Sequence, residues 1–346
     1  MAVPSETTFY LALGLIVIGT GVLKPSVTAM VGGLYPTDDA RRDAGFSIFY
    51  MGINLGAFIC NLVCGTLAAI YGWHYGFGAA GIGMVIGLIV YAWGQKHLAP
   101  DNLSNVRRAA EIAGKDGDRV VEIVKQKLSP SEWKAVWALV GLCLLNVVFW
   151  AVYEQQGNTI ALWADEFTDR TINLVVWSGQ IPVTWFQAFN PFMIFAFTPF
   201  ILALWTRQAK RNSEPNTLSK MAIGCFCMVT ANLVMMTAAI LAGETGQSSW
   251  LWLFAYFVIM TTGELYLSPT SLSLYSKVAP AQILSTMMAV NFIPNFLGGG
   301  FLQGYLGSYW SSMNKVSFFL MIAGISAAAG ILVWSFNKPL KPILKE

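Results

Sequence analysis

Three ionisable residues stand inside long apolar stretches of this 346-residue sequence. Lys24 lies in GTGVLKPSV, Glu154 in WAVYEQQGNT and Glu264 in TTGELYLSP. A charge at the centre of a membrane helix costs at least ~2.5 kcal/mol, and it usually faces a partner, a cavity or an ion pathway. Because protonation of a carboxylate weakens its attraction to a nearby ammonium group, these residues predict proton coupling within a membrane.

Lys24 and Glu264 are predicted to lie at a similar depth. Each stands about three helical turns before the inner end of its apolar run, roughly 15 Å by helical rise and beyond the reach of a snorkelling side chain. Pro25 and Pro269 interrupt the two helices, which favours irregular backbone around a cavity at the midplane. The alternative is a structural ion pair that locks two helices together.

Glu154 allows two interpretations. The polar residues after it are consistent with the outer end of a helix, where a charge is much less unfavourable than at the centre. The apolar residues 160–163 instead indicate that the helix continues outward, in which case Glu154 would line the same cavity. Polar amides inside the apolar runs are expected mainly to form hydrogen bonds between helices. These amides are Asn54, Asn61, Asn190, Asn232, Asn291 and Asn295.

The composition indicates that these residues lie on membrane-spanning helices. The chain is 55% hydrophobic and 11% charged, whereas a soluble domain carries about 25% charged residues. Runs too long for barrel strands predict an all-α polytopic membrane protein with about nine spans. The predicted spans cover 9–34, 44–71, 75–96, 134–160, 186–206, 217–242, 249–274, 282–307 and 315–337.

No pattern of an enzyme is present in the sequence. His74 and His97 stand at loop ends, and there is no nucleophile elbow, phosphate-binding loop or metal-ligand spacing. The five cysteines lie in apolar runs, where a thiol behaves as a small hydrophobic group. We therefore expect no enzymatic activity, no metal and no cofactor, with an ion gradient as the energy source for transport.

The basic residues predict the orientation and the domains. Of the 21 Lys and Arg residues, 18 fall on one set of alternate connections, which is predicted to be cytoplasmic. Met1 is then outside and Glu346 is in the cytoplasm. The only long polar stretch divides the chain into three spans at 1–98, a cytoplasmic linker at 99–133, and a six-helix bundle with a short cytoplasmic tail at 134–346.

Four segments resemble the proton-dependent oligopeptide transporters, a branch of the major facilitator superfamily. They are GTGVLKPSVTAMVGGLYPTDDARRDAGFSIFYMGINLGAF, FWAVYEQQGNTIALWADEFTDR, IPVTWFQAFNPFMIFAFTP and GELYLSPTSLSLYSKVAP, in the family's order. The resemblance implies twelve helices in two six-helix bundles. The nine spans would correspond to the fourth through twelfth, so the first three are expected to be missing.

The resemblance also implies a function, which is proton-coupled symport of di- and tripeptides by alternating access. Lys24 would bind the peptide carboxylate and Glu264 the peptide amino group, while Asn54 and Asn190 would contact the peptide backbone or termini. Glu154 would take part in proton coupling together with Lys24 and Glu264. The expected partners are a small peptide, protons and the lipid bilayer, with no nucleic acid and an open oligomeric state.

Two alternatives remain beside peptide symport. The scaffold could carry another small solute, such as a nitrate-like anion or a drug-like molecule, or the chain could be a truncated fragment that does not transport. Asn291 departs from the family pattern, in which a tryptophan is often found near this point, and this leaves side-chain selectivity open. The expected location is the cell membrane, with a bacterial inner membrane favoured.

Overall fold

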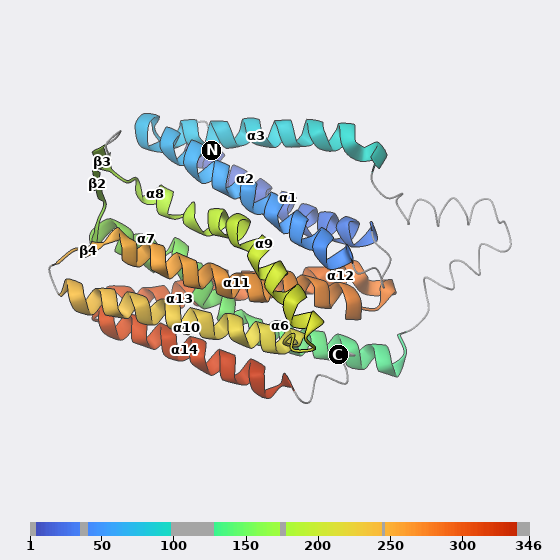
Figure 1. The fold of residues 1–346 in the computed structure, drawn as a ribbon. Helices are drawn as coiled ribbons and strands as arrows, with labels where there is room; N and C mark the ends of the chain where they lie inside the picture. Colours follow the sequence, from blue (N-terminus) through green and yellow to red (C-terminus); the bar gives the residue numbers. More distant parts are fainter. Residues whose placement is uncertain (1–4, 35–40, 98–127, 174–177, 244–245, 338–346) are drawn as a thin grey trace.

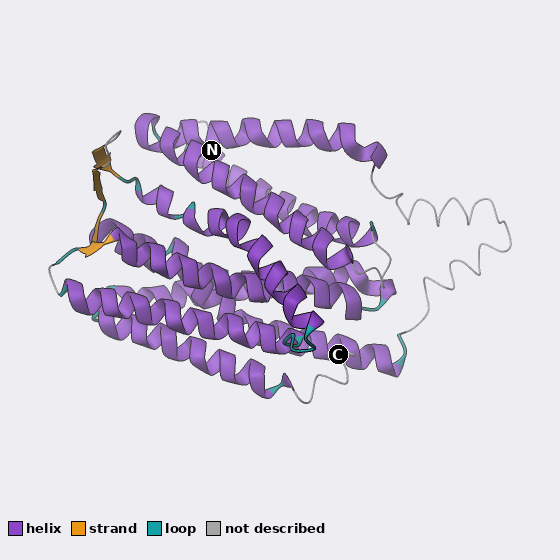
Figure 2. Cartoon of the chain, in the orientation of Figure 1, coloured by secondary structure: helices purple, strands orange, loops and turns teal. Residues whose placement is uncertain are grey.

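The computed structural model describes residues 5–34, 41–97, 128–173, 178–243 and 246–337 and shows a bundle of long helices (Figures 1 and 2). Eight of the described helical segments are long and apolar enough to cross a membrane. The chain is therefore a multi-pass α-helical protein, as the apolar runs predict.

The first part of the chain forms three long helices. They are α1 (Glu6–Gly33), α2 (Arg41–Tyr71) and α3 (Trp73–Gly94), followed by a short 3₁₀ turn, η1 (Gln95–His97). The tight connection between α2 and α3 depends on Gly72, whose φ of 100° lies in the left-handed region that favours glycine. Most apolar side chains of α1 and α3 are exposed, as expected of helices that face lipid.

The second part of the chain begins at α6 (Pro130–Tyr153). Its start is a capping box, in which the Ser129 hydroxyl accepts from the backbone N–H of Glu132 and the Glu132 carboxylate accepts from the backbone N–H of Ser129. Residues 130–133, which are predicted to belong to the linker, are thus already helical. Residues 99–127 of that predicted linker lie outside the described part of the chain.

The remaining elements follow α6 in chain order. They are η3 (Glu154–Gly157), α7 (Thr159–Glu166), β1 (Thr168–Asp169), β2 (Thr171–Asn173), β3 (Ser178–Gln180), α8 (Val183–Phe186), α9 (Phe189–Lys210), α10 (Thr217–Ala242), β4 (Ser248–Ser249), α11 (Trp250–Val278), η4 (Ala281–Ile283), α12 (Leu284–Val290), η5 (Asn295–Leu302), α13 (Gln303–Gly307), η6 (Ser308–Trp310) and α14 (Lys315–Ser335).

The span that contains Glu154 continues well beyond this residue. α6, η3 and α7 together form one apolar segment over Pro130–Glu166, so the backbone tightens at Glu154 but does not leave the span. Beyond Glu154 the chain continues outward as η3 and α7, as residues 160–163 predict. α6 itself ends at Tyr153 with Glu154 at its C-cap, so the position of Glu154 at the outer interface or in the cavity stays a prediction.

The predicted span at 282–307 is not one continuous helix. The chain breaks between α12 and η5, a π-helix that begins after Pro294 and contains Gly298. Proline lacks the N–H that a continuous helix needs, and π-helical turns often occur at functional sites. A Cβ at Gly298 would clash with the backbone oxygen of Val147, so the broken helix packs with its backbone directly on α6.

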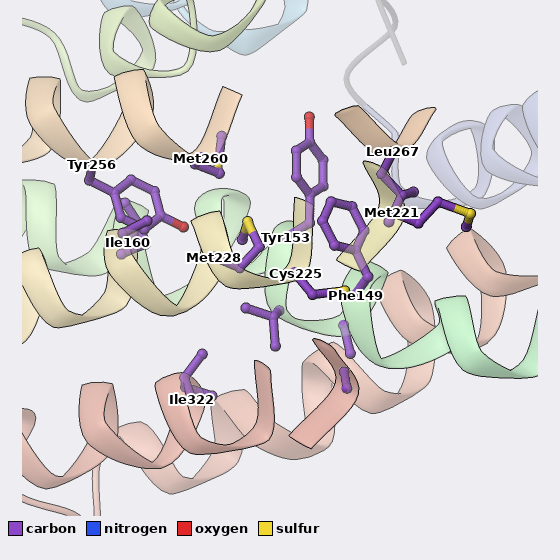
Figure 3. Packing of buried hydrophobic residues seen from close by; sticks show 14 of the residues in the cluster. Phe149, Tyr153, Ile160, Met221, Cys225, Met228, Tyr256, Met260, Leu267 and Ile322 are labelled. Atoms are coloured by element: carbon purple, nitrogen blue, oxygen red, sulfur yellow. The ribbon is translucent and has the colours of Figure 1, made fainter. Parts of the chain in front are cut away.

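The core lies in the second part of the chain, where α10 packs between α11 and α14 (Figure 3). Its side chains are mainly aliphatic, aromatic and sulfur-containing, and they include Met221, Met228, Tyr256, Met260 and Ile322. α10 and α11 approach closely because both carry glycine at their crossing. A Cβ at Gly224 would lie 2.8 Å from the backbone oxygen of Gly263.

All four short strands lie at one end of the bundle, on the left in Figure 1. β1 pairs in parallel with β4, and β2 pairs antiparallel with β3. The end of α3, the start of α6 and the connection between α9 and α10 lie at the opposite end. This end belongs to the side predicted to be cytoplasmic.

Candidate functional site

Glu264 is buried in the middle of α11 with only 2% of its surface exposed. Its carboxylate accepts a hydrogen bond from the Tyr50 hydroxyl on α2. A second bond of 2.7 Å comes from Nδ2 of Asn190 on α9. Two neutral donors from two other helices therefore hold this carboxylate.

Asn190 uses both ends of its amide. Nδ2 donates to Glu264 and also to Oγ1 of Thr261 at 3.1 Å, while Oδ1 accepts from the Tyr153 hydroxyl at 3.2 Å. Tyr50, Tyr153, Asn190, Thr261 and Glu264 form one connected group that we call the Glu264 network. Its members come from α2, α6, α9 and α11, so four helices must pack correctly to form it.

The Glu264 network joins the two predicted bundles. Tyr50 belongs to the three-helix part, whereas its partner Glu264 lies more than 200 residues further along the chain. Two other hydrogen bonds cross the same boundary. Asn61 Nδ2 donates to the Gln187 backbone oxygen at 3.1 Å, and Trp185 Nε1 donates to Thr66 Oγ1 at 3.2 Å. α2 is thus the helix that contacts the second part of the chain most extensively.

Glu154 lies at the break between α6 and η3 and faces the broken helix. Its carboxylate accepts a hydrogen bond of 3.3 Å from Asn295 Nδ2 on η5. Gln303 Nε2 donates to the Glu154 backbone oxygen at 3.1 Å, and Gln155 Nε2 donates to the Gln303 backbone oxygen at 3.0 Å. The two irregular segments of the bundle are therefore bound to each other at this carboxylate.

Lys24 stands apart from the Glu264 network. Its side chain is exposed on α1, and within the described residues it has no carboxylate oxygen within 4.0 Å. Its ammonium group exerts a Coulombic attraction on Glu154. The direct Lys24–Glu264 ion pair, which was the alternative interpretation of these two charges, is not formed in this structure.

Asn54 lies one helical turn after Tyr50 and is buried. Its Nδ2 donates to the Tyr50 backbone oxygen at 2.9 Å, so its side chain bonds within its own helix. The structure thus places Asn190 in direct contact with Glu264. Asn54 lies one helical turn from Tyr50, which is the other residue that donates to Glu264. Glu154 and Lys24 lie outside the network.

Three members of the network were missed by sequence reasoning, namely Tyr50, Tyr153 and Thr261. Each stands at a helical spacing from a residue that the sequence did indicate. Tyr50 is four residues before Asn54, Thr261 is three residues before Glu264, and both spacings share one helix face. Tyr153 directly precedes Glu154. These spacings are the signal that could have identified them.

The chemistry of the network follows from the burial of Glu264. A buried carboxylate without a cation is unfavourable unless a proton neutralises it or a positive group approaches it. The described neighbours of Glu264 supply neutral donors only. The arrangement is therefore suited to exchange between a bound proton and an ammonium group of a ligand.

Comparison with known proteins gives the family. A model of the POT family matches residues 3–104 and 102–320. The chain belongs to the POT family. It is 32% identical over 381 aligned positions to the uncharacterized transporter YclF of Bacillus subtilis (strain 168), covering 99% of this chain and 76% of the relative.

Three further similarities concern proteins whose names or bound ligands are informative. A di-/tripeptide transporter of Lactococcus lactis subsp. cremoris is 28% identical, with 98% of this chain and 77% of that protein covered. The crystal structure of a mutant peptide transporter POT in complex with alafosfalin superposes with a TM-score of 0.77 at 28% identity, covering all of this chain and 77% of that one. A POT family transporter in complex with 5-aminolevulinic acid gives a TM-score of 0.77 at 26% identity, covering 98% of this chain and 78% of that one. The fold is that of the major facilitator superfamily.

Proposed function

We propose that this POT family member is a proton-coupled symporter of di- and tripeptides that works by alternating access. The observation that carries the proposal is the buried Glu264 carboxylate, which is held by donors from both parts of the chain and has no cation beside it among the described residues. A peptide amino group would supply the missing positive charge. The names of the relatives and the ligands of the solved POT structures support this assignment.

The other residues have roles consistent with their positions. Lys24 is exposed and lies away from Glu264, so it can bind the peptide carboxylate while Glu264 binds the amino end. Asn190 contacts the same end as Glu264, and Asn54 contacts the peptide backbone or a terminus. Glu154 takes part in proton coupling with Lys24 and Glu264. No cofactor is needed, because the proton gradient supplies the energy.

We also propose the location and orientation. The protein lies in the cell membrane, favouring a bacterial inner membrane, with the C-terminus in the cytoplasm. The excess of Lys and Arg on one set of connections supports this orientation. The predicted division into 1–98, 99–133 and 134–346 is consistent with it.

The test is uptake of radiolabelled dialanine into proteoliposomes with and without an inward proton gradient. We expect accumulation above equilibrium only with the gradient, and its loss in Glu264→Gln. Asp165→Asn is the matched control, because it removes the charge of an exposed carboxylate, which pairs with the half-buried Arg170. Accumulation by Glu264→Gln equal to that of the wild type would contradict the site.

A second candidate is a non-peptide solute that also carries an amine and a carboxylate. It is favoured by the related transporter bound to 5-aminolevulinic acid. Competition separates the two candidates, since a peptide carrier is inhibited by dialanine at lower concentration than by 5-aminolevulinic acid. If this chain binds dialanine but does not take it up, the alternative of a truncated fragment that does not transport is favoured.

A further inference from the structure

The amide of Asn190 can adopt two orientations, and only one suits a charged Glu264. With Nδ2 towards the carboxylate, the 2.7 Å contact is a charge-assisted hydrogen bond. If the amide were reversed, its oxygen would face a carboxylate oxygen at the same distance, and two acceptors would repel. A contact that fixes the orientation of the Asn190 amide therefore also determines the strength of its hydrogen bond to Glu264.

Tyr153 is the residue placed to fix it. Its hydroxyl donates to Oδ1 of Asn190 at 3.2 Å, whereas Nδ2 of the same amide donates to Glu264. The other amide proton is occupied by Thr261 at 3.1 Å. Both ends of the Asn190 amide thus have hydrogen-bond partners, and Tyr153 supplies the contact that involves the amide oxygen.

The ring of Tyr153 is itself held by packing. It stacks on Phe149, with the ring centroids 6.0 Å apart at an angle of 18°, and meets the edge of Trp150 at 5.1 Å. Figure 3 shows Tyr153 beside Phe149, with its hydroxyl directed away from the apolar cluster. Only 6% of the residue is exposed, so water competes little for the hydroxyl.

We propose that Tyr153 is a positioning residue for the carboxylate site, which acts by orienting the Asn190 amide so that Nδ2 faces Glu264. This inference rests on the proposed function, in which Glu264 binds the amino end of the substrate. It adds a residue whose hydroxyl donates to Asn190 and lies close enough to Glu264 to interact with it, so the route through the amide has to be separated from a direct one. It also connects the last turn of α6, directly before Glu154, to the Glu264 network.

Tyr153→Phe tests the proposal because it keeps the ring and removes the donor. The loss of one buried hydrogen bond corresponds to about a two- to tenfold change in an equilibrium constant. We therefore expect the KM for dialanine to rise by about that factor while the maximal uptake rate stays within about twofold. Tyr256→Phe is the matched control, since Tyr256 is fully buried and its hydroxyl has no hydrogen-bond partner among the described residues. It should leave KM unchanged.

Combining Tyr153→Phe with Asn190→Ala shows whether Tyr153 affects KM through the Asn190 amide. If Tyr153 acts through the amide, Tyr153→Phe adds no further rise in KM once Asn190 is alanine. A rise of the same size in both backgrounds overturns the proposal, and so does an unchanged KM in Tyr153→Phe alone.

The same double-mutant cycle on the midpoint of thermal unfolding in detergent separates this inference from the proposed function. If the wild type neither binds nor transports peptides, the proposed function fails, but the cycle still reports the contact. Non-additive shifts for Tyr153→Phe and Asn190→Ala support the positioning contact, and additive shifts reject it.

Discussion

Glu264 is buried beside neutral hydrogen-bond donors, and this distinguishes it from a structural ion-pair residue. Salt bridges elsewhere in the described chain join carboxylates directly to cations, as Lys220 does with Glu214. At Glu264 the donors are a phenol and an amide. A carboxylate held by neutral hydrogen-bond donors can exchange a proton for an ammonium group without first separating a tight ion pair.

Tyr50→Phe should weaken the site without unfolding the protein. The change removes one of the two donors to Glu264 and keeps the aromatic ring. We expect the KM for dialanine to rise about two- to tenfold, the range for one lost hydrogen bond. The measurement is initial-rate uptake at several dialanine concentrations.

Tyr275→Phe is the contrasting variant for this test. The Tyr275 hydroxyl donates to the Leu139 backbone oxygen at 2.6 Å, so its loss leaves a buried carbonyl without this donor. It should lower the unfolding midpoint and leave KM unchanged. A KM change of equal size in both variants would show that Tyr50 acts only through stability.

Lys24→Ala should abolish proton-driven accumulation of peptide. The variant removes the positive charge that attracts Glu154 and that we assign to the peptide carboxylate. Lys24→Arg keeps the charge and should retain part of the activity. Lys96→Ala, which removes a cation near the Trp93 ring at the end of α3, is the control and should behave like the wild type. Normal accumulation by Lys24→Ala would refute the assignment.

The sequence predicts the charged and amide residues of the site better than the hydroxyl residues. Asn190 and Glu264 are polar in apolar runs, and such residues need a partner wherever they are placed. Tyr50 and Tyr153 carry no such signal, because tyrosine in a membrane helix also serves packing and the interface. Which hydroxyl reaches which carboxylate depends on packing between distant helices, which a periodic pattern does not contain.

At the scale of elements, the two irregular segments lie against each other. η3 tightens the helix at Glu154, and the π-helical η5 presents its glycine backbone to α6. The sequence predicts an apolar run at 282–307 but not its break, because hydropathy averages over Pro294 and the glycines. The presence of Pro294 and these glycines in a predicted membrane helix is the sequence signal for irregular backbone.

Gly299→Ala should impair transport more than Gly300→Ala. A Cβ at Gly299 would lie 2.7 Å from Cγ of Glu154, so this carboxylate would be displaced from Asn295. A Cβ at Gly300 meets nothing within 4 Å and provides the control. We expect proton-driven uptake to fall severalfold in the first variant only. Equal activity of both variants would argue against a role for the Glu154 position.

Gly224→Ala should destabilise the second part of the chain. The added methyl would lie 2.8 Å from the Gly263 backbone oxygen, directly beside Glu264, and α10 and α11 would have to separate. Overpacking of this kind costs about 1–3 kcal/mol. Gly141→Ala on α6 meets nothing within 4 Å and should not lower the unfolding midpoint. Thermal unfolding in detergent compares the two, and equal midpoints would contradict the close crossing.

At the scale of the whole molecule, two sets of contacts join the parts of the chain. α2 packs on α8, α9 and α11, while α1 packs on α12. Alternating access requires the parts of a transporter to rock about the binding site, so these contacts must open in turn. The Glu264 network lies in the first set, and its Tyr50 bond has to break when α2 moves away from α11.

Cysteine labelling tests the predicted orientation. Ser213 lies in the exposed connection between α9 and α10, and Ser311 lies in the exposed connection between η6 and α14. In a variant without the native cysteines, we expect Ser213→Cys to react with an impermeant maleimide only in inside-out vesicles. Ser311→Cys should react only in right-side-out vesicles. The opposite pattern would reverse the proposed topology.

The small parallel pairing of β1 with β4 has a mechanical consequence. Thr168 pairs with Ser248 and Asp169 with Ser249, and the Ser248 hydroxyl also donates to the Phe167 backbone oxygen at 3.0 Å. Two connections 80 residues apart are thereby hydrogen-bonded to each other. We therefore expect α7 and the start of α11 to move together as one rigid body. Spin labels on these two strands should keep the same separation throughout the transport cycle, while labels on α2 and α8 change theirs.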